Sequence, residues 1–113
     1  MENIYLKEVS RNSDGDVSYR IMLGEEEVGS FLTIEDDRDF IFGRQITVHK
    51  EYGRMGIATR VINDFVNNHS KPMRFTIALN SHKAISFWKK YLDSTSFKKT
   101  ELKKDSWQLE KTT

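Results

Sequence analysis

The strongest constraint on the fold is a change of hydrophobic period near Gly56. Over residues 3–48, short segments in which apolar and polar residues mix are separated by turn residues, which is typical of β-strands. From Gly56 to about His69, the apolar residues follow one helical stripe instead: Ile57, Val61, Ile62, Phe65 and Val66. A chain that changes period in its middle is predicted to be neither all-α nor all-β.

Before this change, four strands are expected. They span residues 3–10, 16–23, 27–34 and 39–48. The connections between them are short and rich in Asn, Asp, Ser, Gly and Glu, which favours tight turns. Strands joined by such turns pair antiparallel, so this half is predicted to form a meander.

After the first helix, Lys71-Pro72 stops the helical pattern. Alternation over residues 73–79 predicts a fifth strand, and short strands are expected near 95–100 and 105–110. Asn80 or Ser81 can cap a second helix. The stripe of that helix is Ala84, Phe87, Trp88, Tyr91 and Leu92.

The order of these elements predicts the fold class. The strands before and after the first helix should be parallel, joined by a right-handed crossover. We therefore expect an α+β (mixed α/β) fold with a mixed sheet of about six to seven strands, an antiparallel N-terminal meander, a central parallel β-α-β unit and two main helices. A chain of 113 residues fits one domain, residues 1–113.

Composition excludes several classes of site. With no cysteine, disulfides, thiolate nucleophiles and Cys-ligated zinc are ruled out. His49, His69 and His82 show no metal-ligand spacing, so no metal is expected. No secretory leader or membrane span is visible, and a small domain without disulfides suits the cytosol. We therefore expect a cytoplasmic protein with no membrane partner.

Charge is distributed unevenly along the chain. Residues 1–48 carry eleven acids and five bases, whereas residues 49–113 carry six acids and thirteen bases. This polarity favours an anionic ligand on the C-terminal half and permits a cationic partner near the N-terminal half. Two ordinarily solvated surfaces would give the same counts, and both interpretations stay open.

The segment from Val48 to Thr59 joins a strand to a helix through two glycines. Gly53 and Gly56 permit backbone conformations that other residues rarely adopt. The first N–H groups of a helix lack internal partners and suit a phosphate, and the first turn here contains no acid. Neither a Walker motif nor a dinucleotide fingerprint is present. From the glycines alone, a plain strand–helix turn is favoured over a phosphate site, and both interpretations stay open.

Two segments resemble a known family. Ile46–Ile62 resembles motif A of the GNAT superfamily, [R/Q]-x-x-G-x-[G/A], with Gly56-Ile57-Ala58 matching its end and Gly53 in the Arg/Gln slot. Ser81–Lys90 resembles motif B, N-x-x-A-x-x-F-[YW]-x-K, with Ser81 in the Asn slot. The resemblance covers about residues 25–110.

This resemblance implies that acetyl-CoA is the cofactor and lies between two parallel strands that splay apart, here 39–48 and 73–79. Three groups of cofactor-binding residues follow from it. The pantetheine arm would bond the main chain of Ile46, Thr47 and Val48. The pyrophosphate would lie on the loop and the first helical turn, residues Gly53, Arg54, Met55, Gly56, Ile57, Ala58 and Thr59. Asn80 or Ser81, together with Phe87, would border the ligand.

The implied reaction is N-acetyl transfer by direct attack of a primary amine, either a small molecule or a protein lysine or N-terminus. Family members often use a motif B tyrosine as acid, but Trp88 occupies that slot. Tyr91, one turn further, is the candidate acid, and a packed core tyrosine is the competing interpretation. Asp39 is a candidate base, and a charged turn is its competing interpretation.

One departure from the family concerns the acceptor side. Most members carry two helices between their first two strands, but only about residues 11–15 separate them here. The acceptor side should therefore be open or closed by a second subunit, as in a homodimer. The main alternative function is a catalytically inactive acyl-CoA-binding or protein-interaction module. Nucleic-acid binding through basic residues 98–104 is the least favoured alternative.

Overall fold

The computed structural model describes residues 3–53 and 55–111. It contains seven strands, two α-helices and one 3-10 turn, in the order the sequence predicts. Their bounds are β1 (Ile4–Arg11), β2 (Asp16–Leu23), β3 (Glu26–Ile34), β4 (Ile41–Val48), the turn Lys50–Tyr52, α1 (Ile57–Asn68), β5 (Met73–Thr76), α2 (His82–Ser94), β6 (Lys98–Lys103) and β7 (Ser106–Glu110).

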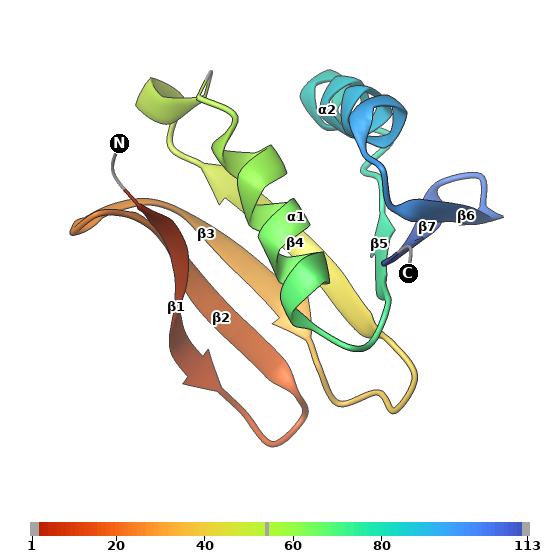
Figure 1. Cartoon of the computed structure of the whole chain (residues 1–113), viewed down its shortest axis with the longest axis horizontal. Helices are drawn as coiled ribbons and strands as arrows, with labels where there is room; N and C mark the ends of the chain where they lie inside the picture. Colours follow the sequence, from red (N-terminus) through yellow and green to blue (C-terminus); the bar gives the residue numbers. More distant parts are fainter. Residues whose placement is uncertain (1–2, 54, 112–113) are drawn as a thin grey trace.

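All seven strands form one sheet in the order β1-β2-β3-β4-β5-β7-β6 (Figure 1). The first four pair antiparallel, β4 and β5 pair parallel, and β7 lies antiparallel between β5 and β6. The predicted meander and the predicted parallel β-α-β unit are both confirmed.

Both helices lie on the same face of the sheet. The crossovers β4-α1-β5 and β5-α2-β6 step across the sheet in one direction, and right-handed connections of this kind put their helices on one side. Side chains agree with this arrangement: Phe65 of α1 meets Phe31 of β3 edge to face, and Trp88 of α2 stacks on Phe75 of β5 at 3.9 Å between ring centroids. One hydrophobic core therefore joins both helices to the sheet.

In the described part of the chain, neither helix combines the length and the apolar character that crossing a membrane would require.

The opposite face of the sheet carries no helix among the described residues. The connection between β1 and β2 is a tight turn. Asn12 Oδ1 accepts the N–H groups of Asp14 and Asp16, and Gly15 has a φ of 85° that suits glycine. We refer to this face of the sheet below as the uncovered face.

Two predicted bounds were wrong. The fifth strand ends at Thr76 rather than at residue 79: the Ile77 N–H still donates to the Asp105 carbonyl of the neighbouring segment at 2.7 Å, but Leu79 is exposed. The sixth strand begins at Lys98 rather than near 95, because α2 continues to Ser94. Alternating apolar residues therefore continue past the point where strand pairing ends.

Candidate functional site

The site is built on the separation of β4 from β5. Only three residue pairs join these strands, from Ile41↔Met73 to Gly43↔Phe75, although β4 continues to Val48. The His49 N–H donates to the Val28 carbonyl at 2.7 Å. Because antiparallel pairs alternate in the direction of their main-chain groups, Ile46 and Val48 direct theirs away from β3 and toward the gap. These groups are placed to bind an extended ligand.

A groove with a volume of about 830 Å³ follows this edge of β4. Its size lies within the range of small-molecule sites, roughly 300–1,000 Å³. Among the described residues, the charged side chains that line it are two lysines, and none is acidic. Its lining residues are Ile46, Thr47, Val48, Lys50, Gly53, Ala58, Ser81, Lys83, Ala84, Phe87 and Trp88. The groove is thus suited to an anionic ligand with an apolar portion.

The start of α1 opens at one end of the groove. Gly56 is its N-cap in the left-handed conformation, with φ 70°, and a Cβ at this position would meet nothing within 4 Å. Its carbonyl accepts the first helical bond from Arg60 at 3.1 Å. The N–H groups of Ile57, Ala58 and Thr59 find no acceptor in the described part of the chain. Together with the helix dipole they favour an anion.

The preceding loop differs from expectation at two residues. Gly53 has φ −65° and ψ −17°, an ordinary right-handed conformation, so its flexibility is not required. It ends the 3-10 turn by donating its N–H to the Lys50 carbonyl. The Met55 N–H donates to the Tyr52 carbonyl at 3.3 Å, so this amide is not free to bind a ligand. Arg54 lies outside the described residues.

The start of α2 lies across the groove. Ser81, not Asn80, is the N-cap: its Oγ accepts the Ala84 N–H at 3.2 Å, and Ser81 lines the groove. Asn80 is exposed in the preceding turn and lies outside the groove lining. Phe87 and Trp88 supply the apolar wall on this side.

A smaller cavity of about 140 Å³ continues inward from the groove. It lies at a β-bulge in β4, where Gly43 pairs with Thr33 and Gln45 pairs with Leu32, which leaves Arg44 as the extra residue. The two cavities share Ile46, Ala84 and Trp88. The inner cavity is lined by Phe31, Gly43, Arg44, Gln45, Ile46, Met73, Phe75, Thr76, Ala78, Ala84 and Trp88.

The inner cavity reaches both faces of the sheet. Phe75 and Trp88 belong to the helix side, where their rings stack. Arg44 contacts Asp16, which alternates with the buried Val17 and so belongs to the uncovered face. The lining of the inner cavity thus includes residues of both faces, and we refer to the gap between β4 and β5 at this point as the passage.

Tyr91, the candidate acid, does not line either cavity. It is buried between the two helices, and its hydroxyl donates to Asn63 Oδ1 at 2.6 Å. Burial raises the pKa of Tyr91 to about 12. These are the surroundings of a packed core tyrosine, the competing interpretation, so we assign Tyr91 no chemical role.

Tyr91→Phe should lower the free energy of unfolding by about 1 kcal/mol, because it leaves the Asn63 side chain without its partner. The wild-type phenol holds its proton more tightly when folded, so the stability it contributes is present below pH 10 and lost as the pH rises toward 12. Urea unfolding of both proteins at pH 8 and above pH 10 would measure this. Equal free energies of unfolding for the two proteins at pH 8 would contradict the prediction.

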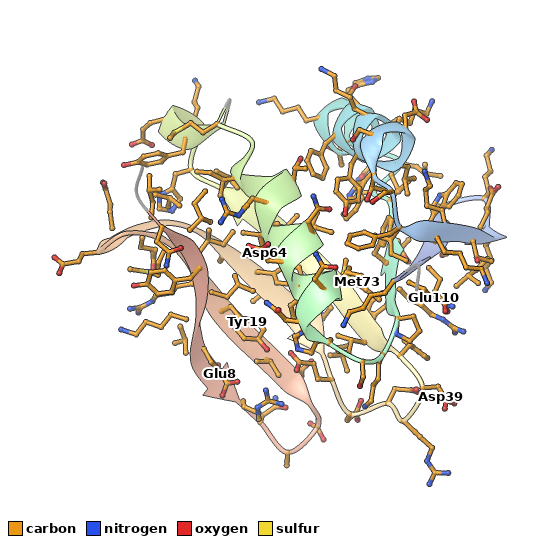
Figure 2. The ribbon with its side chains drawn as sticks, in the orientation of Figure 1. Glu8, Tyr19, Asp39, Asp64, Met73 and Glu110 are labelled. Atoms are coloured by element: carbon orange, nitrogen blue, oxygen red, sulfur yellow. The ribbon has the colours of Figure 1, made fainter. Side chains whose placement is uncertain are left out.

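Asp39, the candidate base, is also remote from the passage. It is exposed on the loop before β4, at the opposite end of the molecule from the first turn of α1 (Figure 2). Its N–H donates to Asp37 Oδ1, which closes a charged turn. The turn interpretation is therefore the one that fits its position.

Glu35, a carboxylate close to Asp39 in the sequence, is largely buried beside His69 at the C-terminal end of α1. Glu35 accepts hydrogen bonds from Tyr19 at 2.7 Å and from Thr33, and lies 3.5 Å from Arg11. Burial opposes ionisation, but the bonds from Thr33 and Tyr19 and the Arg11 charge hold the pKa of Glu35 below its usual value. The partners of the Glu35 carboxylate come from all three N-terminal strands: Arg11 from β1, Tyr19 from β2 and Thr33 from β3. These contacts stabilise the three strands against one another.

Several lining residues were not predicted. Arg44 and Gln45 enter the site through the bulge, for which the sequence gives no signal. Lys50 could have been proposed from its charge and its place in the loop before Gly53. Lys83, a basic residue in the motif B segment, also lines the groove.

The sequence matches no protein-family model, and no curated protein matches it significantly. Solved structures, in contrast, share its fold. A GNAT family acetyltransferase from Elizabethkingia anophelis, solved with acetyl-CoA bound, gives a TM-score of 0.63 at 12% identity over 96% of this chain and 97% of that one.

Two further structures extend this likeness. An acetyltransferase from Thermus thermophilus gives a TM-score of 0.62 at 11% identity, over 86% of this chain and 63% of that one. An Arabidopsis thaliana protein in complex with the bisubstrate analogue CoA-Ac-MVNAL gives 0.54 at 17% identity, over 85% and 72%. At these identities the likeness concerns the fold, and on this evidence the chain has the fold of the GNAT acetyltransferases.

Proposed function

We propose that this protein binds acetyl-CoA in the groove between β4 and α2 and transfers the acetyl group to a primary amine. The observation that carries the proposal is that main-chain donors without a partner in the described residues lie at two ends of one groove. They are at the first turn of α1, around Ala58, and at the free edge of β4, at Val48 and Ile46. This arrangement fits a ligand that has a diphosphate at one end and an amide-containing arm at the other.

The residues present fit such a cofactor. The N–H groups of Ile57, Ala58 and Thr59 would hold the diphosphate, with Lys50 and Lys83 adding charge. Ile46 and Val48 would bond the pantetheine amides as an added strand would. The apolar inner cavity beside Phe75 and Trp88 would receive the acyl end.

The chemistry that acetyl-CoA supplies is an activated acyl group, carried as a thioester. The protein contributes position and electrostatics. A main-chain N–H on Ile46 or Val48 would polarise the carbonyl oxygen, since donors fixed before reaction stabilise developing charge. Phe75 and Trp88 would exclude water from the helix side of the passage. The amine would enter from the uncovered face.

Structures of similar fold support this proposal. The Elizabethkingia protein is covered over 97% of its length by this chain and was solved with acetyl-CoA bound. The Arabidopsis protein was solved with a bisubstrate analogue that joins CoA to a peptide. An amine acceptor on a peptide is therefore compatible with the fold.

Acetyl-CoA and CoA should both raise the melting temperature. Ligand at a hundredfold excess over its dissociation constant stabilises the native state by about 2.7 kcal/mol, which is a shift of roughly 10 °C for a chain of this size. Differential scanning fluorimetry measures the shift, with pantetheine, which lacks the diphosphate, as a weaker ligand for comparison. An unchanged melting temperature at millimolar acetyl-CoA would remove the basis of the proposal.

A catalytically inactive CoA-binding module remains the second candidate, and one observation favours it. Trp88 stands where many enzymes of this fold use a tyrosine, and the described residues lining the inner cavity include no carboxylate or histidine. Release of free thiol from acetyl-CoA in the presence of an amine panel separates the two. Binding without release would assign the module.

A further inference from the structure

The inner cavity is larger than an acetyl group needs. Its volume is about 140 Å³. An engineered apolar cavity of about 150 Å³ in another protein holds benzene, a molecule of six carbons, whereas an acetyl group has only two. Under the proposed function, the acyl end of the cofactor enters this cavity from the groove. An acetyl group would therefore leave part of the cavity unfilled.

The helix side of the cavity is apolar and is closed by the hydrophobic core. Phe31, Met73 and Phe75 line it, and each of them is at most 2% exposed. Trp88 covers Phe75 by stacking on its ring at 3.9 Å. Apolar surface that is buried on binding contributes affinity in proportion to its area. A hydrocarbon chain longer than acetyl would gain this contribution here.

The polar side chains of the described lining belong to the other end of the cavity. They are Arg44, Gln45 and Thr76. Arg44 is turned toward Asp16 on the uncovered face, and Thr76 alternates with Phe75 of the helix side. The described helix side therefore offers no charged or hydroxyl side chain. An acyl chain with a polar group would lose hydrogen bonds to water on entering it.

The size of the helix side is set by Gly43 and Met73 together. A Cβ at Gly43 would lie 2.8 Å from Met73 Cε and 3.7 Å from Met73 Sδ, so the thioether lies directly over the glycine (Met73 is labelled in Figure 2). The φ of Gly43 is not positive, so its backbone does not require glycine. The missing side chain instead leaves room for the thioether and for the cavity beside it. A flexible methionine can adapt its shape to a bound chain.

Resting on the proposed function, we infer that the inner cavity is an acyl-chain site and that the protein prefers a saturated acyl group of about four carbons, such as butyryl, over acetyl. The whole volume would hold about six carbons, but the amine needs the end at the uncovered face. The transfer itself is unchanged. The neutral amine nitrogen bonds to the acyl carbon, the carbon–sulfur bond breaks, the thiolate takes up a proton, and the nitrogen gives one to water.

The first test measures how wild-type protein binds thioesters that differ only in the acyl group. The ligands are acetyl-, propionyl-, butyryl-, hexanoyl- and 3-hydroxybutyryl-CoA, and calorimetry gives their affinities without an acceptor amine. Each buried methylene contributes about fourfold in affinity, so butyryl-CoA should bind about tenfold more tightly than acetyl-CoA. Hexanoyl-CoA should gain nothing further. The hydroxyl of 3-hydroxybutyryl-CoA should cancel the gain of the longer chain.

Two variants should move this preference in opposite directions. Gly43→Ala places a methyl group in the cavity against the Met73 thioether, so butyryl-CoA should lose its advantage over acetyl-CoA. Met73→Val removes the thioether, so hexanoyl-CoA should bind about fourfold more tightly than butyryl-CoA. The matched control is Met22→Val. Met22 is 8% exposed and lines neither cavity, so this variant should keep the wild-type order of affinities.

Three outcomes would overturn the inference while the proposed function stands. The first is acetyl-CoA binding to the wild type at least as tightly as butyryl-CoA. The second is equal binding of butyryl- and 3-hydroxybutyryl-CoA, and the third is the wild-type order of affinities in Gly43→Ala. If Met73→Val fails to fold, the wild type and Gly43→Ala decide. Absence of a melting shift with any of these thioesters, and with CoA itself, would instead refute the proposed function.

Discussion

Replacing Ala58 by glutamate should strongly reduce the stabilisation by acetyl-CoA while leaving the free protein about as stable as before. Ala58 is the second residue of α1, is half-buried and lines the groove. A carboxylate in the first turn of a helix interacts favourably with the dipole by about 0.3–1 kcal/mol, which offsets the small loss of helix propensity. The same carboxylate occupies the place proposed for the diphosphate and repels it.

The size of the effect follows from Coulomb's law. Two like charges about 4 Å apart near a protein surface repel by about 4 kcal/mol, so binding should weaken by more than a hundredfold before screening and at least tenfold after it. Calorimetric titration with acetyl-CoA at two salt concentrations measures this, and the difference between variants should shrink at high salt. The matched control is Ala58→Gln, which has the same length without the charge.

Ala58→Gln should retain most of the affinity, because an amide can donate to a phosphate oxygen. Equal losses in the two variants would mean that bulk, not charge, excludes the ligand. Undiminished binding in Ala58→Glu would place the ligand away from the start of α1. In that case, the melting shift of the wild type would need another site.

The elements that the sequence predicts well are those in which pattern and local geometry agree. The stripe from Ile57 to Val66 predicts α1, and the structure buries all five of its apolar residues. Short polar turns predict the antiparallel meander, because a two- to five-residue connection leaves the chain little alternative. Gly56 is a comparable case, since its left-handed φ is the conformation for which glycine is suited.

The predictions that failed depend on tertiary geometry. Residues 77–79 continue the alternation of β5, yet pairing stops at Thr76 because β4 and β5 have already separated. Tyr91 and Trp88 share one apolar stripe of α2, but the stripe is wide. Trp88 therefore lies in the cavity wall, whereas Tyr91 lies between the two helices. Spacing along a helix does not determine which neighbour each residue meets.

The inner cavity shows the same limit more clearly. It exists because one extra residue in β4 turns Arg44 and Gln45 toward the same face, and because the following half of β4 leaves β5. A bulge of this kind has no sequence signature in the stretch Phe42-Gly43-Arg44-Gln45-Ile46. Residue-level expectations for the acceptor side therefore fell on nearby acids such as Asp39, which the fold places elsewhere.

Gly29→Ala should lower the free energy of unfolding by about 3 kcal/mol, which is at the upper end of the usual cost of overpacking. This loss is a large part of a typical free energy of unfolding, about 5–15 kcal/mol. A Cβ at Gly29 would lie 2.1 Å from the Thr47 carbonyl oxygen and 3.0 Å from the Val48 Cα, and both atoms are backbone, so neither can rotate away. Relief requires β4 to move from β3 beside the His49–Val28 bond, which displaces the edge that carries Ile46 and Val48.

The matched control for this substitution is Gly53→Ala, because the chemical change is identical. Gly53 already has a right-handed conformation, and its Cβ would meet only the Lys50 carbonyl oxygen at 3.3 Å, so the free energy of unfolding should change by less than about 1 kcal/mol. Denaturant unfolding of both variants gives the comparison, and acetyl-CoA titration of Gly29→Ala at low temperature should show weakened binding as well. Equal stability losses would mean that the β3–β4 contact yields easily. The free edge of β4 would then be too compliant to serve as a fixed template for the ligand, since a template must hold its donors in place before the ligand arrives.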